Sequence, residues 1–292
     1  MCKGYSPVEF FFLTSGFFLY RLSVKDVGII AYFKSRVLRL YPAYLISLIL
    51  YIILLCDSYS IFDFIYELSL MQGCISIPEV NCANRVVWYV SVLVWGGFFV
   101  FLLLKRTKST ILLLGISLFI YFMLLGACGS FDDTFSNWGI IHLPFWRGIA
   151  GLLLGACLSK INDDFNNNKI KDKTFSFIWI IGIVAFILSL ILMFLPYKTE
   201  FLSLLCYCIV LLACMSSEDK FSRALPNITD ITYEMFLLHL LIIKITVKSL
   251  DMVGLLDLSI MKYITYFMFL IAVSYLYKRF IKYLMSLISR VF

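Results

Sequence analysis

Residues 10–45 read FFFLTSGFFLYRLSVKDVGIIAYFKSRVLRLYPAYL, and this stretch decides the class of fold. An apolar segment interrupted by Ser15-Gly16 leads into a short basic connection. The connection ends in Arg36-x-x-Arg39, and Pro42 opens a second apolar segment. Apolar segments joined by short basic connections are typical of a chain that crosses a membrane repeatedly.

The composition supports the same class. Of the 292 residues, 62% are hydrophobic and only 15% are charged, whereas soluble domains carry about 25% charged residues. The 28 Phe and 18 Tyr residues suit lipid-facing and interfacial surfaces. We therefore predict an all-α, polytopic integral-membrane helical bundle that forms a single domain over residues 1–292. The net charge of +7 is spread over the connections, which argues against a nucleic-acid partner.

A membrane span needs about 20 apolar residues, and this criterion predicts about nine transmembrane helices. The expected spans are 8–22, 38–56, 86–104, 110–127, 144–159, 175–196, 200–215, 230–249 and 259–285. The polar stretch Lys160–Thr174 between two of them is expected to be a flexible loop. Residues 278–292 are expected to form a basic, cytoplasmic amphipathic tail on the membrane surface.

The connections between the spans alternate between basic and acidic or neutral character. Basic loops stay in the cytoplasm, so the expected location is the cell (plasma or inner) membrane with the basic loops inside. This orientation places Arg36 and Arg39 in the cytoplasm. It places Trp138 and His142 on the opposite side.

Arg36 and Arg39 lie three residues apart, which on a helix puts both guanidinium groups on one face. The planar fork of an arginine matches phosphate oxygens, so the pair suits a ligand that carries phosphates. The alternative is that both residues only flank a span and set its orientation.

The same stretch resembles the signature of the acyltransferase 3 family of integral-membrane acyltransferases. Members carry Phe-Phe-x-x-Ser-Gly-Phe, then Arg-x-x-Arg, then a Pro at the next helix. Two later segments, Trp88–Ser91 and Ile231–His239, also resemble the family, in the same order along the chain. The residues that match its first block are Phe11, Phe12, Ser15, Gly16, Phe17, Arg36, Arg39 and Pro42.

The resemblance implies an O-acyltransferase with no bound cofactor that uses acyl-coenzyme A, with acetyl-coenzyme A as first candidate. The acyl group would pass from cytoplasmic coenzyme A to a hydroxyl of a cell-surface or lipid-linked polysaccharide. Arg36 and Arg39 would bind the donor, and Ser15 and Gly16 would shape its acyl path. The alternative for Ser15-Gly16 is helix packing by small residues. Members also carry one more span before the Ser-Gly-Phe segment, with the catalytic His, and this sequence begins after it.

The chain has only two histidines, His142 and His239. His239 lies in the middle of an expected span, where an ionisable side chain is costly and points to function. It is the predicted catalytic residue of this chain, in a role secondary to the catalytic His that the resemblance places on the preceding span. The alternative is an interhelical hydrogen bond.

An acceptor site is predicted at the outer ends of the spans. Aromatic rings there stack on sugar faces, although an interfacial aromatic belt is the alternative. Glu9 would bind the acceptor or orient the His of the preceding helix, unless it is a solvated carboxylate. The predicted acceptor-binding residues are Glu9, Trp138, His142, Trp146 and Arg147.

The nine cysteines predict no metal site, because no Cys-x-x-Cys pair with metal spacing occurs. Cys74 and Cys82 share a polar loop and are predicted to form a disulfide if that loop faces an oxidising compartment. Two other functions compete with the enzyme: a lipid-linked sugar flippase or transporter, and an inactive, truncated acyltransferase.

Overall fold

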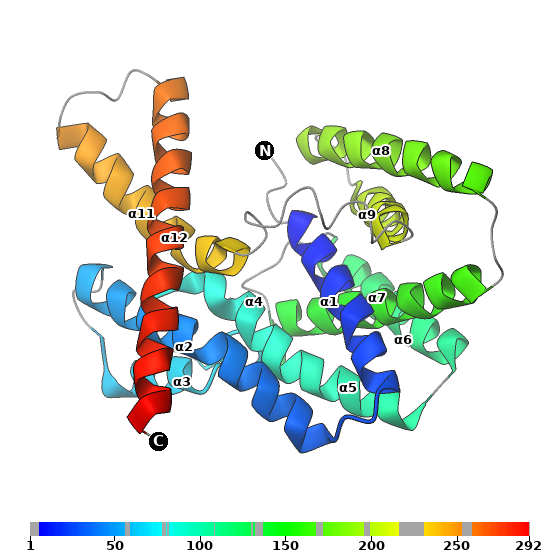
Figure 1. Ribbon diagram of the computed structural model, residues 1–292, viewed down its shortest axis with the longest axis horizontal. Helices are drawn as coiled ribbons and strands as arrows, with labels where there is room; N and C mark the ends of the chain where they lie inside the picture. Colours follow the sequence, from blue (N-terminus) through cyan, green and yellow to red (C-terminus); the bar gives the residue numbers. More distant parts are fainter. Residues whose placement is uncertain are drawn as a thin grey trace. The chain divides into compact units, whose positions relative to one another are not determined.

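The described part of the chain folds almost entirely into helices, so the predicted all-α class is confirmed (Figure 1). The computed structural model describes residues 6–55, 59–77, 80, 82–107, 109–129, 131, 137–167, 172–195, 199–215, 231–252 and 259–291. Among these residues, the strands β1 (Asn137–Trp138) and β2 (Ile141–His142) form one antiparallel hairpin.

Helices α1 to α7 and two short irregular turns make up the first part of the described chain. They are α1 (Ser6–Val24), α2 (Ile29–Leu55), α3 (Ile61–Leu68), a 3₁₀ turn (Arg85–Val87), α4 (Trp88–Ser91), a π-helix (Val92–Gly96), α5 (Gly97–Arg106), α6 (Thr110–Cys128) and α7 (Leu143–Asn167). The later helices are α8 (Asp172–Phe194), α9 (Glu200–Met215), α11 (Thr232–Met252) and α12 (Ser259–Val291).

Each expected span coincides with helical structure over nearly all of its described residues, and the span 86–104 is divided among the 3₁₀ turn, α4, the π-helix and α5. Within the described ranges, four segments are long and apolar enough to cross a membrane: Ile29–Leu55, Trp88–Arg106, Thr110–Cys128 and Tyr263–Leu287. Two shorter apolar segments, Ile178–Phe194 and Glu200–Met215, accompany them. The membrane class therefore holds, and the count of about nine crossings stays a prediction.

The second span differs from its prediction, because α2 already begins at Ile29 and Pro42 lies inside it. Tyr32 explains the early start: its N–H bonds to the Gly28 carbonyl at 2.9 Å, and its ring stacks on Phe101 with centroids 4.1 Å apart. Burial of the Tyr32 ring stabilises a helix that begins N-terminal to the basic residues. Arg36 and Arg39 consequently lie within a helix rather than in a connection.

The polar stretch Lys160–Thr174, expected to be a loop, is also helical over most of its length. Helix α7 continues to Asn167, and α8 begins at Asp172. Ser159 and Asn162 are buried, so polar residues of α7 contribute to its packed face. At the other end of the chain, α12 continues through Lys278 without a break. The surface position of residues 278–292 stays a prediction.

The chain separates into two compact units. Unit 1 consists of Met1–Lys34, Leu70–Ile77 and Trp88–Arg223, and unit 2 of Ser35–Ser69, Pro78–Val87 and Ala224–Phe292. The boundary passes through α2. The single domain expected over residues 1–292 stays a prediction.

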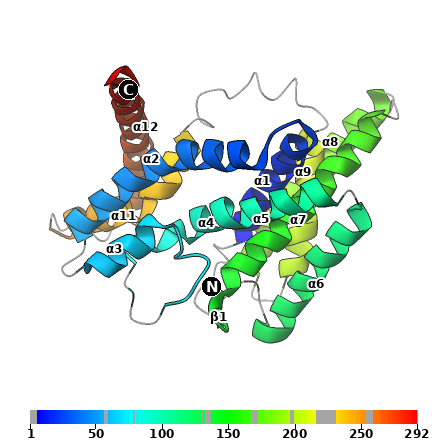
Figure 2. The same ribbon diagram turned by 90° about the horizontal axis from the view of Figure 1, so that it is seen from below.

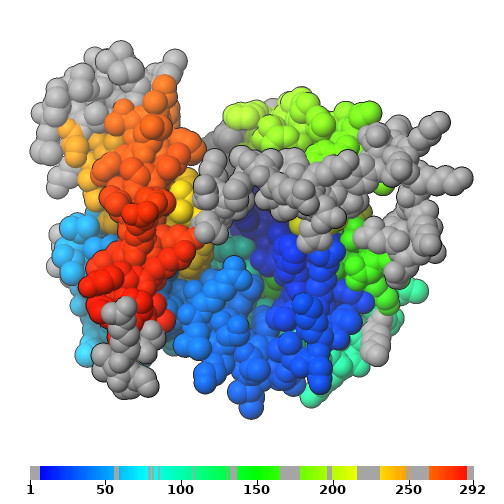
Figure 3. Space-filling model, viewed as in Figure 1, coloured from blue at the N-terminus to red at the C-terminus, as the bar shows by residue number. Residues whose placement is uncertain are grey.

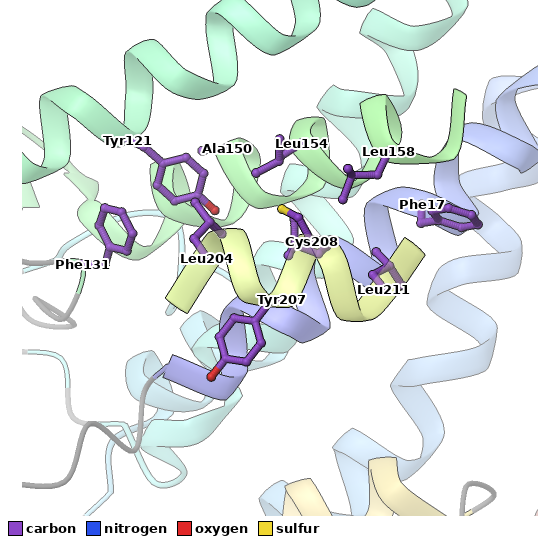
Figure 4. Close-up of a cluster of buried hydrophobic side chains, with 11 residues drawn as sticks. Phe17, Tyr121, Phe131, Ala150, Leu154, Leu158, Leu204, Tyr207, Cys208 and Leu211 are labelled. Atoms are coloured by element: carbon purple, nitrogen blue, oxygen red, sulfur yellow. The ribbon is translucent and has the colours of Figure 1, made fainter. Parts of the chain in front are cut away.

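Unit 1 is built on the crossing of α1 and α7. Gly16 of α1 lies against the Leu152 backbone, and Gly155 of α7 lies against the Leu13 backbone. Helix α6 lies beside α7 (Figure 2), and the Ser117 hydroxyl donates to the Ala150 carbonyl at 2.7 Å. Figure 4 shows the adjoining apolar cluster. Its members are Leu13, Phe17, Tyr121, Phe131, Ala150, Leu154, Leu158, Leu204, Tyr207, Cys208 and Leu211.

Unit 2 is held by tyrosine hydroxyls that donate to backbone carbonyls of neighbouring helices. Tyr44 of α2 donates to the Glu67 carbonyl of α3 at 2.6 Å. Tyr233 of α11 donates to Leu40 at 3.0 Å, and Tyr277 of α12 donates to Ala43 at 2.5 Å. Part of α12 is exposed in Figure 3, where it is coloured orange to red.

Candidate functional site

A buried cluster of polar side chains lies within unit 1, and we call Glu9, Tyr121, Arg147 and Trp88 the carboxylate cluster. The Nε of Arg147 donates to Glu9 Oε1, and the Tyr121 hydroxyl donates to Glu9 Oε2 at 2.7 Å. The exposed fractions are 3% for Glu9, 1% for Arg147 and 0% for Tyr121. Glu9 is therefore a paired, buried carboxylate, and the solvated alternative is wrong.

An aromatic face completes the carboxylate cluster. The guanidinium carbon of Arg147 lies 5.9 Å from the centroid of the Trp88 ring, which is within cation–π range. Phe12 of α1 lies next to Trp88, with ring centroids 6.0 Å apart. The carboxylate cluster thus brings together α1, which carries the Phe-Phe-x-x-Ser-Gly-Phe motif, the Trp88 segment and α7.

Small residues bring these elements together. A Cβ at Gly148 would lie 2.1 Å from Cγ1 of Val92, and one at Gly151 would lie 2.7 Å from Cβ of Phe12. Backbones approach this closely only where a side chain is missing. The glycines of α7 therefore allow Glu9 and Arg147 to meet. Val92 belongs to the π-helix, an irregularity often found at functional sites.

The remaining predicted acceptor residues surround the β-hairpin. Trp138 and Trp146 both line an apolar pocket of about 360 Å³, together with Phe119, Ile120, Met123 and Leu124. His142 donates its backbone N–H to the Cys74 carbonyl at 3.1 Å. Burial lowers the pKa of the His142 imidazole, which favours the neutral ring. The predicted acceptor residues therefore fall into three groups. Glu9 pairs with Arg147, Trp138 and Trp146 share a pocket, and His142 belongs to neither group.

The predicted disulfide between Cys74 and Cys82 is absent from this structure. Cys74 is a buried free thiol. It lies on the turn whose carbonyl accepts the His142 bond, where it serves as a small buried apolar side chain.

The predicted donor-binding residues are divided between the units. Arg36 and Arg39 lie on α2 within unit 2, one helical turn apart. Arg36 is half-buried, and its buried Nε has no hydrogen-bond partner in the described part of the chain. Arg39 is exposed. A buried guanidinium nitrogen without a partner is costly, so an anionic ligand at this position would be favoured.

Ser15 and Gly16 lie in unit 1 on α1, which runs unbroken from Ser6 to Val24. Both residues therefore lie inside the helix that was predicted over residues 8–22. The space beside Gly16 is filled by the α7 backbone: a Cβ there would lie 2.0 Å from the Leu152 oxygen. This geometry favours the packing alternative for Gly16, and a donor-binding role stays a prediction.

His239 lies half-buried on α11 in unit 2. Its Nδ1 lies 2.7 Å from the Phe236 carbonyl oxygen. A carbonyl only accepts, so Nδ1 carries the hydrogen, and Nε2 of the neutral ring keeps its lone pair. Nε2 is therefore the ring atom that can accept a hydrogen bond, and the secondary catalytic role of His239 stays a prediction.

Sequence reasoning missed Tyr121. The signal was the pair Ser117 and Tyr121, four residues apart in a span that is otherwise apolar. Both side chains make buried hydrogen bonds to other helices. Among the described residues, no group of three or more His, Cys, Asp or Glu side chains could hold a metal ion.

The helical architecture, the apolar spans and the carboxylate cluster define a helical membrane protein with a polar interior site. A family model described as an acyltransferase domain matches residues 8–279. The comparisons with curated proteins and with solved structures found no match. The chain belongs to the acyltransferase 3 family, as its resemblance predicted, and is a membrane acyltransferase in general class.

Proposed function

We propose that the protein transfers an acetyl or other short acyl group from cytoplasmic acyl-coenzyme A to a hydroxyl of a cell-surface or lipid-linked polysaccharide. The family match over residues 8–279 supports the class of reaction. The observation that carries the donor assignment is the pair Arg36 and Arg39 on one face of α2, with a buried Arg36 Nε that lacks a described partner. The protein would work in the plasma or inner membrane with its basic loops in the cytoplasm.

The chemistry needs a base for the acceptor hydroxyl and cations for the donor phosphates. The hydroxyl oxygen attacks the thioester carbon, the C–S bond breaks, and the coenzyme A thiolate leaves. A general base would take the hydroxyl proton and return it to the leaving sulfur. The resemblance assigns this role to the His of the preceding span, and His239 would act in a secondary role. Arg36 and Arg39 would bind the phosphates, and no bound cofactor is required.

The acceptor would be recognised at the outer ends of the unit 1 helices. Trp138 and Trp146 offer ring faces to a sugar or to the apolar part of a lipid carrier. The carboxylate cluster would hold Arg147 in one orientation beside Trp88.

Binding of acyl-coenzyme A to the purified protein in lipid nanodiscs tests the donor assignment. The double variant Arg36→Ala with Arg39→Ala should lose binding and acyl transfer while its expression and thermal stability stay normal. Arg106→Ala is the control, because Arg106 is a basic, exposed residue in the last turn of α5 and is not a predicted donor-binding residue. Wild-type affinity in the double variant would overturn the assignment.

A carrier of lipid-linked sugars is the second candidate, and buried charges within helices favour it. Glu9 and Arg147 are buried as a pair, and Glu234 is also buried. Intramembrane charges often mark transport pathways. Release of free thiol from acyl-coenzyme A in the presence of acceptor supports the enzyme. Movement of a labelled lipid-linked sugar across vesicles without thiol release supports the carrier.

A further inference from the structure

Helix α3 buries its acidic side and exposes its apolar side, which is the reverse of a helix that faces water. The carboxylates of Asp63 and Glu67 are buried. Ile61, Phe62 and Ile65 are exposed, with exposed fractions of 80%, 57% and 57%. Residues three and four positions apart are neighbours on a helix, so these three side chains form one apolar face of α3.

The buried carboxylates of α3 find their partners within unit 2. Asp63 Oδ2 accepts a hydrogen bond from the Ser60 N–H, and the Ser60 hydroxyl oxygen accepts one from the Asp63 N–H, both at 3.0 Å. Glu67 accepts hydrogen bonds from the Tyr59 hydroxyl and from the Ala83 N–H. The protein therefore holds the acidic side of α3 inward, without need of water at these groups.

The carboxyl end of α3 is closed by side chains of α2. The last carbonyl groups of a helix have no partner inside that helix. Here the Tyr44 hydroxyl donates to the Glu67 carbonyl at 2.6 Å, and the Tyr41 hydroxyl donates to the Leu68 carbonyl at 2.8 Å. In a membrane interior, backbone polar groups must bond within the protein, and these two carbonyls meet that requirement.

An open apolar groove of about 430 Å³ lies between the last turns of α2 and the beginning of α3. Ile49, Ile52 and Ile53 line the groove from α2, and Ile61 and Phe64 line it from α3. All five of these side chains are hydrocarbon, so the groove matches an alkyl chain.

Tyr59 and Ser60 also line the groove. Their hydroxyl groups are already engaged, because the Tyr59 hydroxyl donates to Glu67 and the Ser60 oxygen accepts from the Asp63 N–H. A sugar needs several polar partners, and the groove has few to offer. This lining favours an alkyl chain over a carbohydrate as the occupant.

The surface around the groove continues the surface of a membrane span. Helix α2 is long and apolar enough to cross a membrane, and Ile49, Ile53 and Leu54 are exposed on its last turns. The apolar face of α3 adjoins these residues across the groove. Because lipid chains cover the exposed apolar side chains of a span, the same lipid chains would cover α3.

We propose that α3 is embedded in the bilayer and that the groove between α2 and α3 holds a hydrocarbon chain of a membrane phospholipid. The apolar face of α3 contacts neighbouring lipid chains, while its acidic side stays turned into unit 2. Part of the connection between the spans predicted at 38–56 and 86–104 thus lies inside the membrane. This role makes no use of acyl transfer, so a failure of the proposed function leaves it standing.

Photo-crosslinking in nanodiscs of phosphatidylcholine tests the proposal. The amino acid p-benzoylphenylalanine, whose excited ketone inserts into nearby C–H bonds, replaces Ile61 at the groove in one variant and Ile65 on the apolar face in another. After irradiation, each variant should gain the mass of one phosphatidylcholine, and fragmentation should place the new bond on an acyl chain. The same replacement at Asp26, an exposed residue between α1 and α2, is the control and should give no acyl-chain adduct.

Fluorescence gives a second measurement, which serves if a crosslinking variant fails to fold. Phe62→Trp adds one tryptophan to the five native ones, and lipid brominated on its acyl chains should quench the added emission. The added emission of Asp26→Trp should be quenched much less. The proposal would be overturned by folded variants that give no lipid adduct at either position, or by unquenched emission from Phe62→Trp. A crosslink to a second copy of the chain would also overturn it, because protein would then cover the apolar face.

Discussion

The Nε of Arg147 donates a hydrogen bond to the carboxylate of Glu9, although 138 residues separate the two in the sequence. The Tyr121 hydroxyl bonds the second carboxylate oxygen. Both charges are buried, so each depends on the other for compensation. This pair links α1 to α7 within the carboxylate cluster.

Removing one charge of this pair should destabilise the protein strongly. Glu9→Gln leaves Arg147 buried without its counter-ion, and breaking a buried pair costs about 3–5 kcal/mol. The double variant Glu9→Gln with Arg147→Met should recover much of this loss because no buried charge remains. Thermal unfolding in detergent measures the effect, with Asp164→Asn as an exposed control. Equal stability of Glu9→Gln and the native protein would show that the pair is not required.

A glycine-to-alanine substitution should lower stability at the contact between α1 and α7 and raise it on the open face of α6. Gly16→Ala and Gly155→Ala place a Cβ 2.0 Å from a backbone oxygen of the other helix, and overpacking costs about 1–3 kcal/mol or more. Gly115→Ala on α6 meets nothing within 4 Å and should stabilise its helix by about 0.5–1 kcal/mol. Unfolding midpoints of the three variants give the comparison. Stabilisation at all three positions would contradict the close helix packing.

Glu67 of α3 should make stability depend on pH. It is fully buried, and it accepts hydrogen bonds from the Tyr59 hydroxyl and from the N–H groups of Ala83 and Asn84. Burial outweighs these bonds and raises the pKa of the Glu67 carboxyl. The folded protein then binds a proton more tightly than the unfolded chain, so stability falls as pH rises from the ordinary pKa of 4.5 to the raised value.

The variant Glu67→Gln tests this pH dependence, because a neutral amide of the same shape does not titrate. Its free energy of unfolding should lack the decline that the native protein shows in this pH window. Asp26→Asn, which changes an exposed carboxylate, should retain the native slope. A native slope in Glu67→Gln would assign the pH dependence to another group.

Cys74 should resist alkylation in the folded protein. Burial raises the pKa of its thiol to about 12, from an ordinary value of 9.0, and only the thiolate reacts. In a variant that keeps Cys74 as its single cysteine, a maleimide should label the protein slowly before denaturation and rapidly afterwards. A variant that keeps only the half-buried Cys82 provides the comparison. Equal labelling rates before denaturation would contradict the burial of Cys74.

The helices and the family could be predicted from the sequence because their signals are local. Apolar segments of span length identified every region in which the structure has a long helix, and the block from Phe11 to Pro42 carried the family. The start of α2 at Ile29 was missed because it depends on the Tyr32 ring packing on Phe101, a contact made far along the chain. The helical extension of α7 to Asn167 was missed because its sequence is polar, although Asn162 in it is buried against the rest of the fold.

The sequence by itself determined that the chain is an all-α membrane protein of the acyltransferase 3 family. Hydropathy and short motifs depend only on residues that are close together in the sequence. Only the tertiary structure decided which polar groups meet. Glu9 finds Arg147 and Tyr121, and the Tyr51 hydroxyl finds the Leu241 N–H, across 112 to 190 residues of chain. Such pairs follow from how helices cross, because glycines permit close approach and a buried polar group is stabilised by a hydrogen-bond partner.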